Sequence, residues 1–115
     1  MNACIFCKIV KKEIPVSPAY ESEKVLAFAD LHPQAPIHFL IIPKPHYGNL
    51  NEVPEAELKI VEEMYRAARQ IATQKGIQER GYRLAMNVNL EGGQSVFHVH
   101  LHLLGGRRMG PSLIG

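Results

Sequence analysis

Apolar residues recur at helical spacing in one long segment of the chain, residues 54–76. Its apolar positions, every third or fourth residue, are Leu58, Val61, Met64, Tyr65, Ala68, Ile71 and Ala72. Pro54 suits the first turn of a helix, and Lys75 followed by Gly76 suits its end. The pattern predicts one long amphipathic helix whose apolar stripe covers a sheet.

Four other segments combine apolar, β-branched and aromatic residues and are bounded by turn residues, as strands are. They span residues 24–30, 38–43, 82–88 and 95–104. A short strand around Tyr20 is expected to pair with the first of them. Because helix and strands come in blocks, with short loops between neighbouring strands, a mostly antiparallel sheet is favoured over a parallel doubly wound one. The chain is therefore predicted to have an α+β fold.

Length, composition and charge narrow the class of protein. A chain of 115 residues suits a single domain over residues 1–115, and 46% hydrophobic with 21% charged residues is typical of a globular protein. The net charge of +2 is scattered, without the basic stripe of a nucleic-acid-binding protein. No apolar run approaches the roughly 20 residues of a membrane helix, and residues 1–13 lack the features of a secretion signal. We therefore expect a cytoplasmic protein with no nucleic-acid or membrane partner, in which Cys4 and Cys7 are reduced thiols or metal ligands.

Histidine is concentrated in "HVHLH", residues 98–102, which holds three of the six histidines. Side chains alternate along a strand, so His98, His100 and His102 would share one face. The opposite face carries the apolar residues Phe97, Val99, Leu101 and Leu103. We expect the apolar face to pack under the long helix, leaving three imidazoles about 7 Å apart on the other face.

Such a row of imidazoles could support nucleophilic catalysis. Imidazole titrates near pH ~6.5, so at neutral pH one ring can attack phosphorus while a neighbour supplies a proton. Just upstream is "GGQS", residues 92–95, where two glycines could form a backbone nest for phosphate oxygens and Ser95 could donate to a leaving group. The alternatives are an exposed polar face and a metal site in which histidines two apart chelate an ion. The residues alone leave catalysis and metal binding open.

The histidine segment and its surroundings resemble a known family. "HVHLHLL" is similar to the histidine triad motif, and "GGQSVFHVHLHLLGGR" resembles the Hint branch of the histidine triad proteins. "FADLHPQAPIHFLIIPKPH", "GYRLAMN" and the tail "GGRRMGPSLIG" resemble the same branch, so the likeness spans nearly the whole chain. It implies a five-stranded sheet with one long helix and a short N-terminal helix, and a homodimer across which the sheet continues.

The resemblance also implies an activity, the hydrolysis of purine nucleoside 5′-phosphoramidates such as AMP joined to lysine, with no cofactor required for catalysis. His100 would be the nucleophile that becomes nucleotidylated, His102 would contact the phosphate, and His38 would support the row. Ser95 would help to protonate the leaving amine. Further positions match the family's nucleotide-binding residues: Asp30 and Leu31 for ribose and base, and Asn87, Gly93 and Gln94 for phosphate and sugar.

Some of these residues also have purely structural interpretations. Asp30 could form a turn at the end of a strand, and Asn87 could bridge backbone groups in a hairpin. His38 could be a buried histidine satisfied by a carbonyl group.

Cys4 and Cys7 have the spacing of zinc ligands but supply only half of a four-ligand site. In some relatives with a similar N-terminal segment, the two thiolates bind zinc together with the histidine of a "PKxH" segment and the first triad histidine. The matching residues here are His46 and His98, which would leave His100 free to act. The alternative is a pair of reduced cysteines packed as small apolar residues.

Three other functions stay open at this point. One is a dinucleoside polyphosphate hydrolase of a neighbouring branch, against which the serine of "GGQS" and the tail "GGRRMGP" argue. Another is a nucleotide-binding interaction protein in which hydrolysis is incidental. The third is a small zinc protein that uses its cysteines and histidines structurally.

Overall fold

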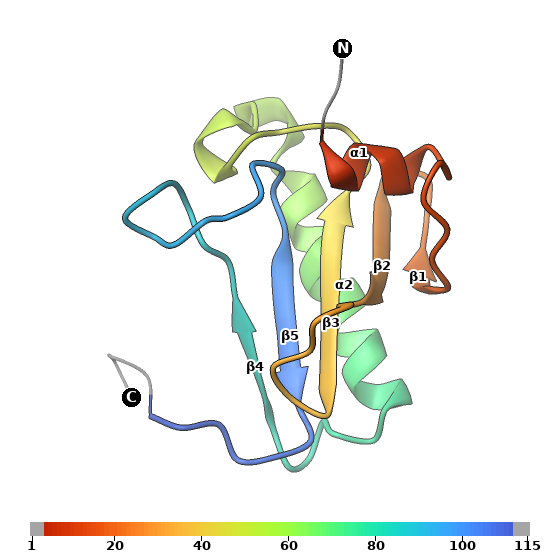
Figure 1. Ribbon diagram of the computed structural model, residues 1–115, viewed down its shortest axis with the longest axis vertical. Coiled ribbons are helices and arrows are strands. Elements are labelled where there is room, and N and C mark those ends of the chain that lie inside the picture. Colours follow the sequence, from red (N-terminus) through yellow and green to blue (C-terminus); the bar gives the residue numbers. More distant parts are fainter. Residues whose placement is uncertain (1–3, 112–115) are drawn as a thin grey trace.

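The computed structural model describes residues 4–111 of the chain (Figure 1). Its helices and strands are, in chain order, α1 (Ile5–Val10), β1 (Pro18–Glu21), β2 (Val25–Ala29), β3 (Ile37–Pro43), α2 (Lys59–Gln74), β4 (Tyr82–Ala85) and β5 (Leu101–Gly105). Two short 3-10 turns, Leu50–Glu52 and Glu55–Glu57, precede α2. The strands form one five-stranded sheet in the order β1-β2-β3-β5-β4, and all neighbours are antiparallel. The predicted α+β architecture is therefore confirmed, including the short N-terminal helix and the pairing of β1 with β2.

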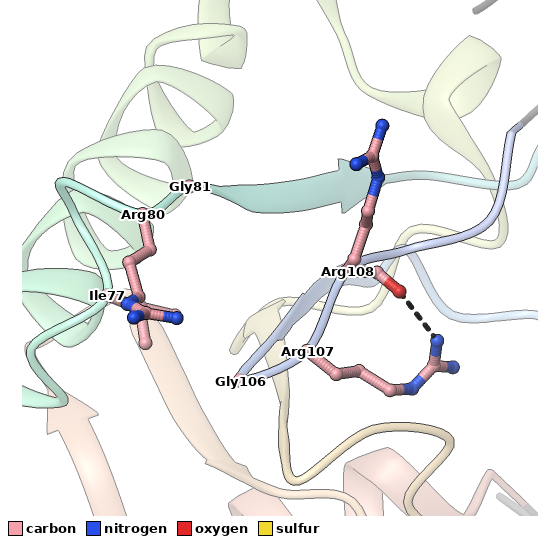
Figure 2. A pocket seen from close by; sticks show the side chains of 6 residues that line it. All are labelled: Ile77, Arg80, Gly81, Gly106, Arg107 and Arg108. Carbon is pink, nitrogen blue, oxygen red and sulfur yellow. Dashed lines mark hydrogen bonds between the residues drawn. The ribbon is translucent and has the colours of Figure 1, made fainter.

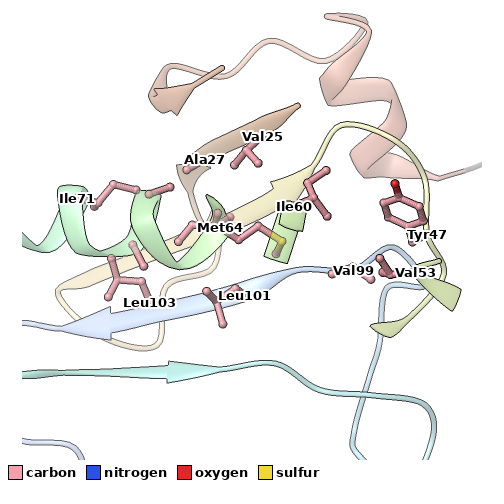
Figure 3. Close-up of a cluster of buried hydrophobic side chains, with 13 residues drawn as sticks. Val25, Ala27, Tyr47, Val53, Ile60, Met64, Ile71, Val99, Leu101 and Leu103 are labelled. Atoms are coloured by element: carbon pink, nitrogen blue, oxygen red, sulfur yellow. The ribbon is translucent and has the colours of Figure 1, made fainter. Parts of the chain in front are cut away.

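Helices pack on both faces of the sheet, α2 on one and α1 on the other (Figure 1). On one face the side chains of α2 pack against the sheet in the larger core (Figure 3), which contains Val25, Ala27, Ile41, Val99, Leu101 and Leu103 from the strands and their extensions. On the other face α1 contributes Phe6 and Ile9 to a second cluster with Leu26, Phe28, Leu40 and Ile42. Alternate residues of β2 and β3 thus enter opposite cores, as the two-residue period of a strand requires.

The long helix is shorter than expected, and its buried stripe is rotated. Residues 55–57 form a 3-10 turn, and α2 begins at Lys59. The buried positions of α2 are Ile60, Met64, Ala67, Ala68, Ile71 and Ala72. Leu58 and Tyr65 are 38% and 45% exposed, so the prediction that they face the sheet is wrong. Three of the six buried positions are alanines, so small side chains make up half of the stripe that faces the sheet.

The histidine strand is also shorter than predicted. The ladder of β5 begins at Leu101, so residues 95–100 precede it. Beyond Ala85 the neighbouring strand β4 ends, and the Val99 N–H donates instead to the Tyr47 carbonyl at 2.8 Å. Alternation nevertheless extends upstream of the ladder, because Val99, Leu101 and Leu103 all enter the core under α2 as expected. Phe97 does not, since it is 45% exposed.

No helix within residues 4–111 has both the length and the apolar character needed to cross a membrane.

Candidate active site

His100 lies immediately before β5, on the face of the sheet opposite α2, and is only 5% exposed. Its Nδ1 lies 2.8 Å from the carbonyl oxygen of His98. A carbonyl only accepts hydrogen bonds, so Nδ1 must carry a proton, and in the neutral ring Nε2 then carries the lone pair. The ring of Phe6 packs edge-on against His100, with the ring centroids 5.2 Å apart. A backbone group and an aromatic ring therefore fix both the orientation and the tautomer of this imidazole.

A second set of hydrogen bonds fixes the tautomers of His38 and His102. The Gln34 backbone N–H donates to His38 Nδ1 at 3.0 Å, so that nitrogen is an acceptor. The proton of a neutral His38 is then on Nε2, which lies 2.9 Å from His102 Nδ1. His102 must accept there and carry its own proton on Nε2. The two rings form a directed relay that ends in an N–H donor on His102.

Asp30 adds a carboxylate to this relay. Its Oδ2 lies 3.4 Å from His38 Nε2, and its Oδ1 accepts the His32 N–H at 2.8 Å. The turn role expected for Asp30 is thus present together with a contact to the histidines. Leu31, the next residue, is 76% exposed.

Burial keeps the relay histidines uncharged. Desolvation lowers the pKa of His102 to about 4, and the positive charges that His100 and His38 can carry add to this effect. Desolvation also lowers the pKa of His38, although the Asp30 carboxylate opposes the shift. Both rings are therefore neutral at pH 7, as the relay of tautomers requires.

The three triad histidines do not form the evenly spaced row that alternation predicts. The centroids of His100 and His102 are 5.0 Å apart in an edge-on arrangement, closer than the expected spacing of about 7 Å, and only His102 lies within the ladder. The His98 ring turns toward the cysteines instead. His38 takes the place beside His102 that completes the row.

The glycine-rich turn differs from the expected phosphate nest. The N–H groups of Gly92, Gly93 and Gln94 all donate to backbone carbonyls of residues 89–90, so they are used within the turn. Gly93 has φ +79°, and a Cβ on Gly92 would lie 2.3 Å from the Val88 oxygen. Both glycines are therefore required by the turn itself, and their contact with phosphate stays a prediction.

Two of the polar residues around this turn, Gln94 and Asn87, form hydrogen bonds within the protein. Gln94 is buried, and its amide donates to the carbonyls of Gly48 and Val96 at 2.7 and 3.0 Å and accepts the Asn89 N–H at 2.8 Å. Asn87 donates to the Gly93 carbonyl at 3.3 Å, which is the bridging role considered for it. Ser95 is exposed.

Cys4, Cys7, His46 and His98 converge, with their ligand atoms within 4.8 Å of one another. His98 Nδ1 lies 3.3 Å from Cys4 Sγ and 3.6 Å from Cys7 Sγ, and His46 Nδ1 lies 3.2 Å from both Cys7 Sγ and His98 Nδ1. Zinc bonds of roughly 2.0–2.3 Å in a tetrahedron place ligand atoms about 3.3–3.8 Å apart. The observed separations are close to these values.

The protonation of His98 also suits a cation, although burial raises the pKa of the Cys4 thiol. His98 Nε2 donates to the Pro43 carbonyl at 2.8 Å, which leaves Nδ1 with a lone pair that faces the sulfurs. Burial lowers the pKa of His98 to about 4, so the ring is neutral, as a metal ligand must be. The residues present therefore fit a tetrahedral zinc ion.

Several groups that orient the histidines could not be identified from the sequence. The carbonyls of His98 and Pro43 and the N–H of Gln34 are backbone groups, and any residue type supplies them. The ring of Phe6 packs edge-on against both His98 and His100, and the sequence did not indicate this contact. The expected short N-terminal helix was the one feature of the sequence that could have indicated a residue packed against the histidines.

Residues 3–113 of the chain match the protein family described as "Scavenger mRNA decapping enzyme C-term binding". The structure of a HIT family hydrolase from Legionella pneumophila superposes with a TM-score of 0.89 at 48% identity, covering 93% of this chain and 96% of that one. The chain belongs to the histidine triad family of hydrolases.

Two curated relatives of this histidine triad protein cover most of its length. One is named "Purine nucleoside phosphoramidase", from Escherichia coli K12, and is 49% identical over 109 residues, which is 95% of this chain and 92% of that protein. The other is named "14 kDa zinc-binding protein", from Zea mays, and is 50% identical over 107 residues, which is 91% of this chain and 83% of that protein. The family expected from the histidine motif is therefore confirmed.

Proposed function

We propose that this histidine triad protein hydrolyses purine nucleoside 5′-phosphoramidates, of which AMP joined to an amine such as lysine is the type, through a nucleotidyl intermediate on His100. The observation that carries the proposal is the hydrogen bond from His100 Nδ1 to the His98 carbonyl, because in the neutral ring it leaves the lone pair on Nε2, where it can attack phosphorus. The name of the E. coli relative supports the choice of substrate.

In the first step His100 Nε2 attacks phosphorus, and the bond between phosphorus and the amine nitrogen breaks. The leaving nitrogen takes up a proton, for which the Ser95 hydroxyl is the expected donor. His102, with its proton on Nε2, would donate to a phosphoryl oxygen whose charge grows in the transition state. The His38 ring holds that proton in place through its own Nε2–H.

In the second step water attacks the nucleotidyl group on His100. The bond between phosphorus and His100 breaks, hydroxide joins phosphorus, and the remaining proton restores the donor that protonated the amine. AMP is released and the neutral imidazole returns. Splitting one displacement into two easier ones is the advantage of a covalent intermediate.

The nucleotide itself would lie along the segment that holds Asp30 and along the turn near Asn87. Asp30 is a half-buried carboxylate that can accept from ribose hydroxyls, and exposed Leu31 offers an apolar surface to a base. Asn87, Gly93 and Gln94 would line the phosphate and sugar. Because Gln94 and the Gly93 N–H are engaged within the protein, they would line this site through the shape that they give the turn.

The proposal includes a structural zinc ion held by Cys4, Cys7, His46 and His98. When bound, zinc would supply a fixed tetrahedral crosslink and no chemistry at phosphorus. The carbonyl of His98 would then be held firmly, and this carbonyl orients His100. Reduced cysteine ligands also suit the cytoplasmic location expected from the sequence.

We further propose that two copies of the chain form a homodimer in which the sheet continues through β4. This strand lies at an edge of the sheet, where its outer hydrogen-bonding groups can pair with another strand.

The direct test compares the parent protein with His100→Gly, using adenosine 5′-phosphoramidate as the substrate. We expect the parent to release AMP, and the variant to lose turnover while its affinity for AMP changes little. A variant that hydrolyses the substrate at the parent rate would refute the mechanism. A dinucleoside polyphosphate is tested as a second substrate, because faster hydrolysis of that compound would indicate a dinucleoside polyphosphate hydrolase and not a phosphoramidase.

A further inference from the structure

The chain that leaves β5 turns back onto the loop before β3. Gly105 pairs with Ile37 in the ladder, and Gly106 follows with φ +89°. A Cβ on Gly106 would lie 3.0 Å from the Pro36 Cβ, so the two segments are already in close contact. This packing places Arg107 over the loop of residues 33–36.

Arg107 holds that loop by a hydrogen bond. Its Nη2 donates to the Gln34 carbonyl at 2.9 Å, and its Nη1 donates to the Arg108 carbonyl at 3.1 Å. A cavity of about 430 Å³ lies beside it, lined by Arg80, Arg107 and Arg108 among others, but their side chains extend in different directions (Figure 2). The three guanidinium groups therefore do not form an anion site. What distinguishes Arg107 from Arg80 and Arg108 is its hydrogen bond to the Gln34 carbonyl.

Gln34 is fixed on three sides. Its carbonyl accepts from Arg107, its side-chain amide donates to the His32 carbonyl at 3.3 Å, and its N–H donates to His38 Nδ1 at 3.0 Å. The first two bonds hold the residue that makes the third. Gln34 is exposed, so without these restraints its N–H could turn toward water.

The bond from Gln34 to His38 favours one placement of two protons, and Asp30 Oδ2, 3.4 Å from His38 Nε2, favours the same placement. While Nδ1 accepts the Gln34 N–H, His38 keeps its proton on Nε2 and donates to His102 Nδ1. If Gln34 moved away, the Asp30 carboxylate alone would oppose the other tautomer, in which His38 accepts at Nε2. His102 would then protonate Nδ1 and lose the Nε2–H that faces outward from the relay.

We propose that Arg107 is a positioning residue: through the Gln34 carbonyl it keeps the Gln34 N–H on His38 and so maintains His102 with its proton on Nε2. The placement of the protons depends only on the hydrogen bonds of the described residues. Its effect on turnover rests on the proposed function.

The first experiment measures the tautomers directly. Long-range proton–nitrogen NMR spectra of the imidazoles distinguish a ring with its proton on Nε2 from one with it on Nδ1. We expect His38 and His102 of the parent to show the Nε2–H pattern, and Arg107→Ala to show mixed or averaged shifts at both rings. Arg108→Ala is the matched control, because it removes the same charge from the adjacent residue and keeps the carbonyl that Arg107 contacts.

The second experiment measures kinetics with adenosine 5′-phosphoramidate. Loss of one charge-assisted hydrogen bond predicts a fall in kcat of about fivefold to tenfold in Arg107→Ala, with KM within about twofold of the parent. Arg107→Lys keeps one donor and the charge, so it should recover part of the loss.

The inference is overturned if Arg107→Ala leaves the ring shifts of His38 and His102 unchanged, or if Arg108→Ala changes them equally. A parent protein that hydrolyses no phosphoramidate, yet shows the expected tautomer change in Arg107→Ala, would refute the proposed function and support the positioning role. The two failures are therefore distinguishable.

Discussion

Replacing His38 with phenylalanine tests the relay most sharply. Phenylalanine keeps an aromatic ring of similar size but has no ring nitrogens. The substitution therefore removes two hydrogen bonds, the one from Gln34 at 3.0 Å and the one to His102 at 2.9 Å. Gln34 is exposed and can bond to water, whereas the Nδ1 of half-buried His102 loses its donor.

The expected magnitude follows from that unpaired acceptor. A buried polar group without a partner costs about 1–3 kcal/mol, and partial exposure of His102 favours the lower half of this range. We expect the free energy of unfolding to fall by ~1–2 kcal/mol. The kcat should fall by about fivefold to 30-fold, because each 1.36 kcal/mol is roughly a tenfold change in rate and the His102 Nε2–H is no longer enforced.

Urea denaturation and steady-state hydrolysis of adenosine 5′-phosphoramidate measure these two effects. His32→Phe is the control, because His32 is exposed and only its backbone N–H contacts Asp30. A folded His38→Phe protein that turns over at the parent rate would refute the relay. Equal losses in His32→Phe would show that the loop, and not the His38 ring, is responsible.

Three further predictions concern pH, metal and the glycine turn. The folded-state pKa of His102 is about 4, below its unfolded value of ~6.5, so protons favour the unfolded chain. The contribution of His102 to stability should be constant above pH ~6.5 and fall toward pH 4, so urea denaturation of His102→Gln should show a shallower loss over this range. The purified protein should contain about one zinc ion per chain by elemental analysis, and Cys7→Ser should contain none and melt at a lower temperature. Gly92→Ala should lose about 1–3 kcal/mol of stability, since its Cβ would lie 2.3 Å from the Val88 oxygen, whereas Gly110→Ala, with nothing within 4 Å, should lose none. If Gly92→Ala were as stable as the parent, the steric explanation for this glycine would be wrong.

Periodicity in the sequence was sufficient to predict the sheet, the long helix and the face that carries the histidines. Val99, Leu101 and Leu103 reach the core because alternate residues of an extended segment must point to opposite sides. The errors have a common origin, which is that the ends of elements depend on their neighbours. The predicted start of the histidine strand at Ser95 was too early because β4 ends at Ala85, opposite His102, and the Val99 N–H donates to the Tyr47 carbonyl in a loop.

The site was predictable in its residue types and less so in its arrangement. The sequence indicated a cluster of imidazoles, but the separation of His98 from His100 depends on where the backbone turns and on which carbonyls the rings meet. The same holds for the glycine turn, where N–H groups that could bind an anion donate within the chain. Any residue type can supply a backbone hydrogen bond, whether from the same turn or from a distant segment such as Pro43, so these bonds could not be predicted.

The account depends on His100 Nε2 as the nucleophile, and a trapped intermediate tests it most directly. The parent protein is mixed with adenosine 5′-phosphoramidate, quenched in alkali within milliseconds to seconds, digested and mapped by mass spectrometry. We predict an added adenylyl group on His100, absent from His100→Gly. An adduct on His98 or His102, or turnover that proceeds with no adduct at any time, would contradict the account.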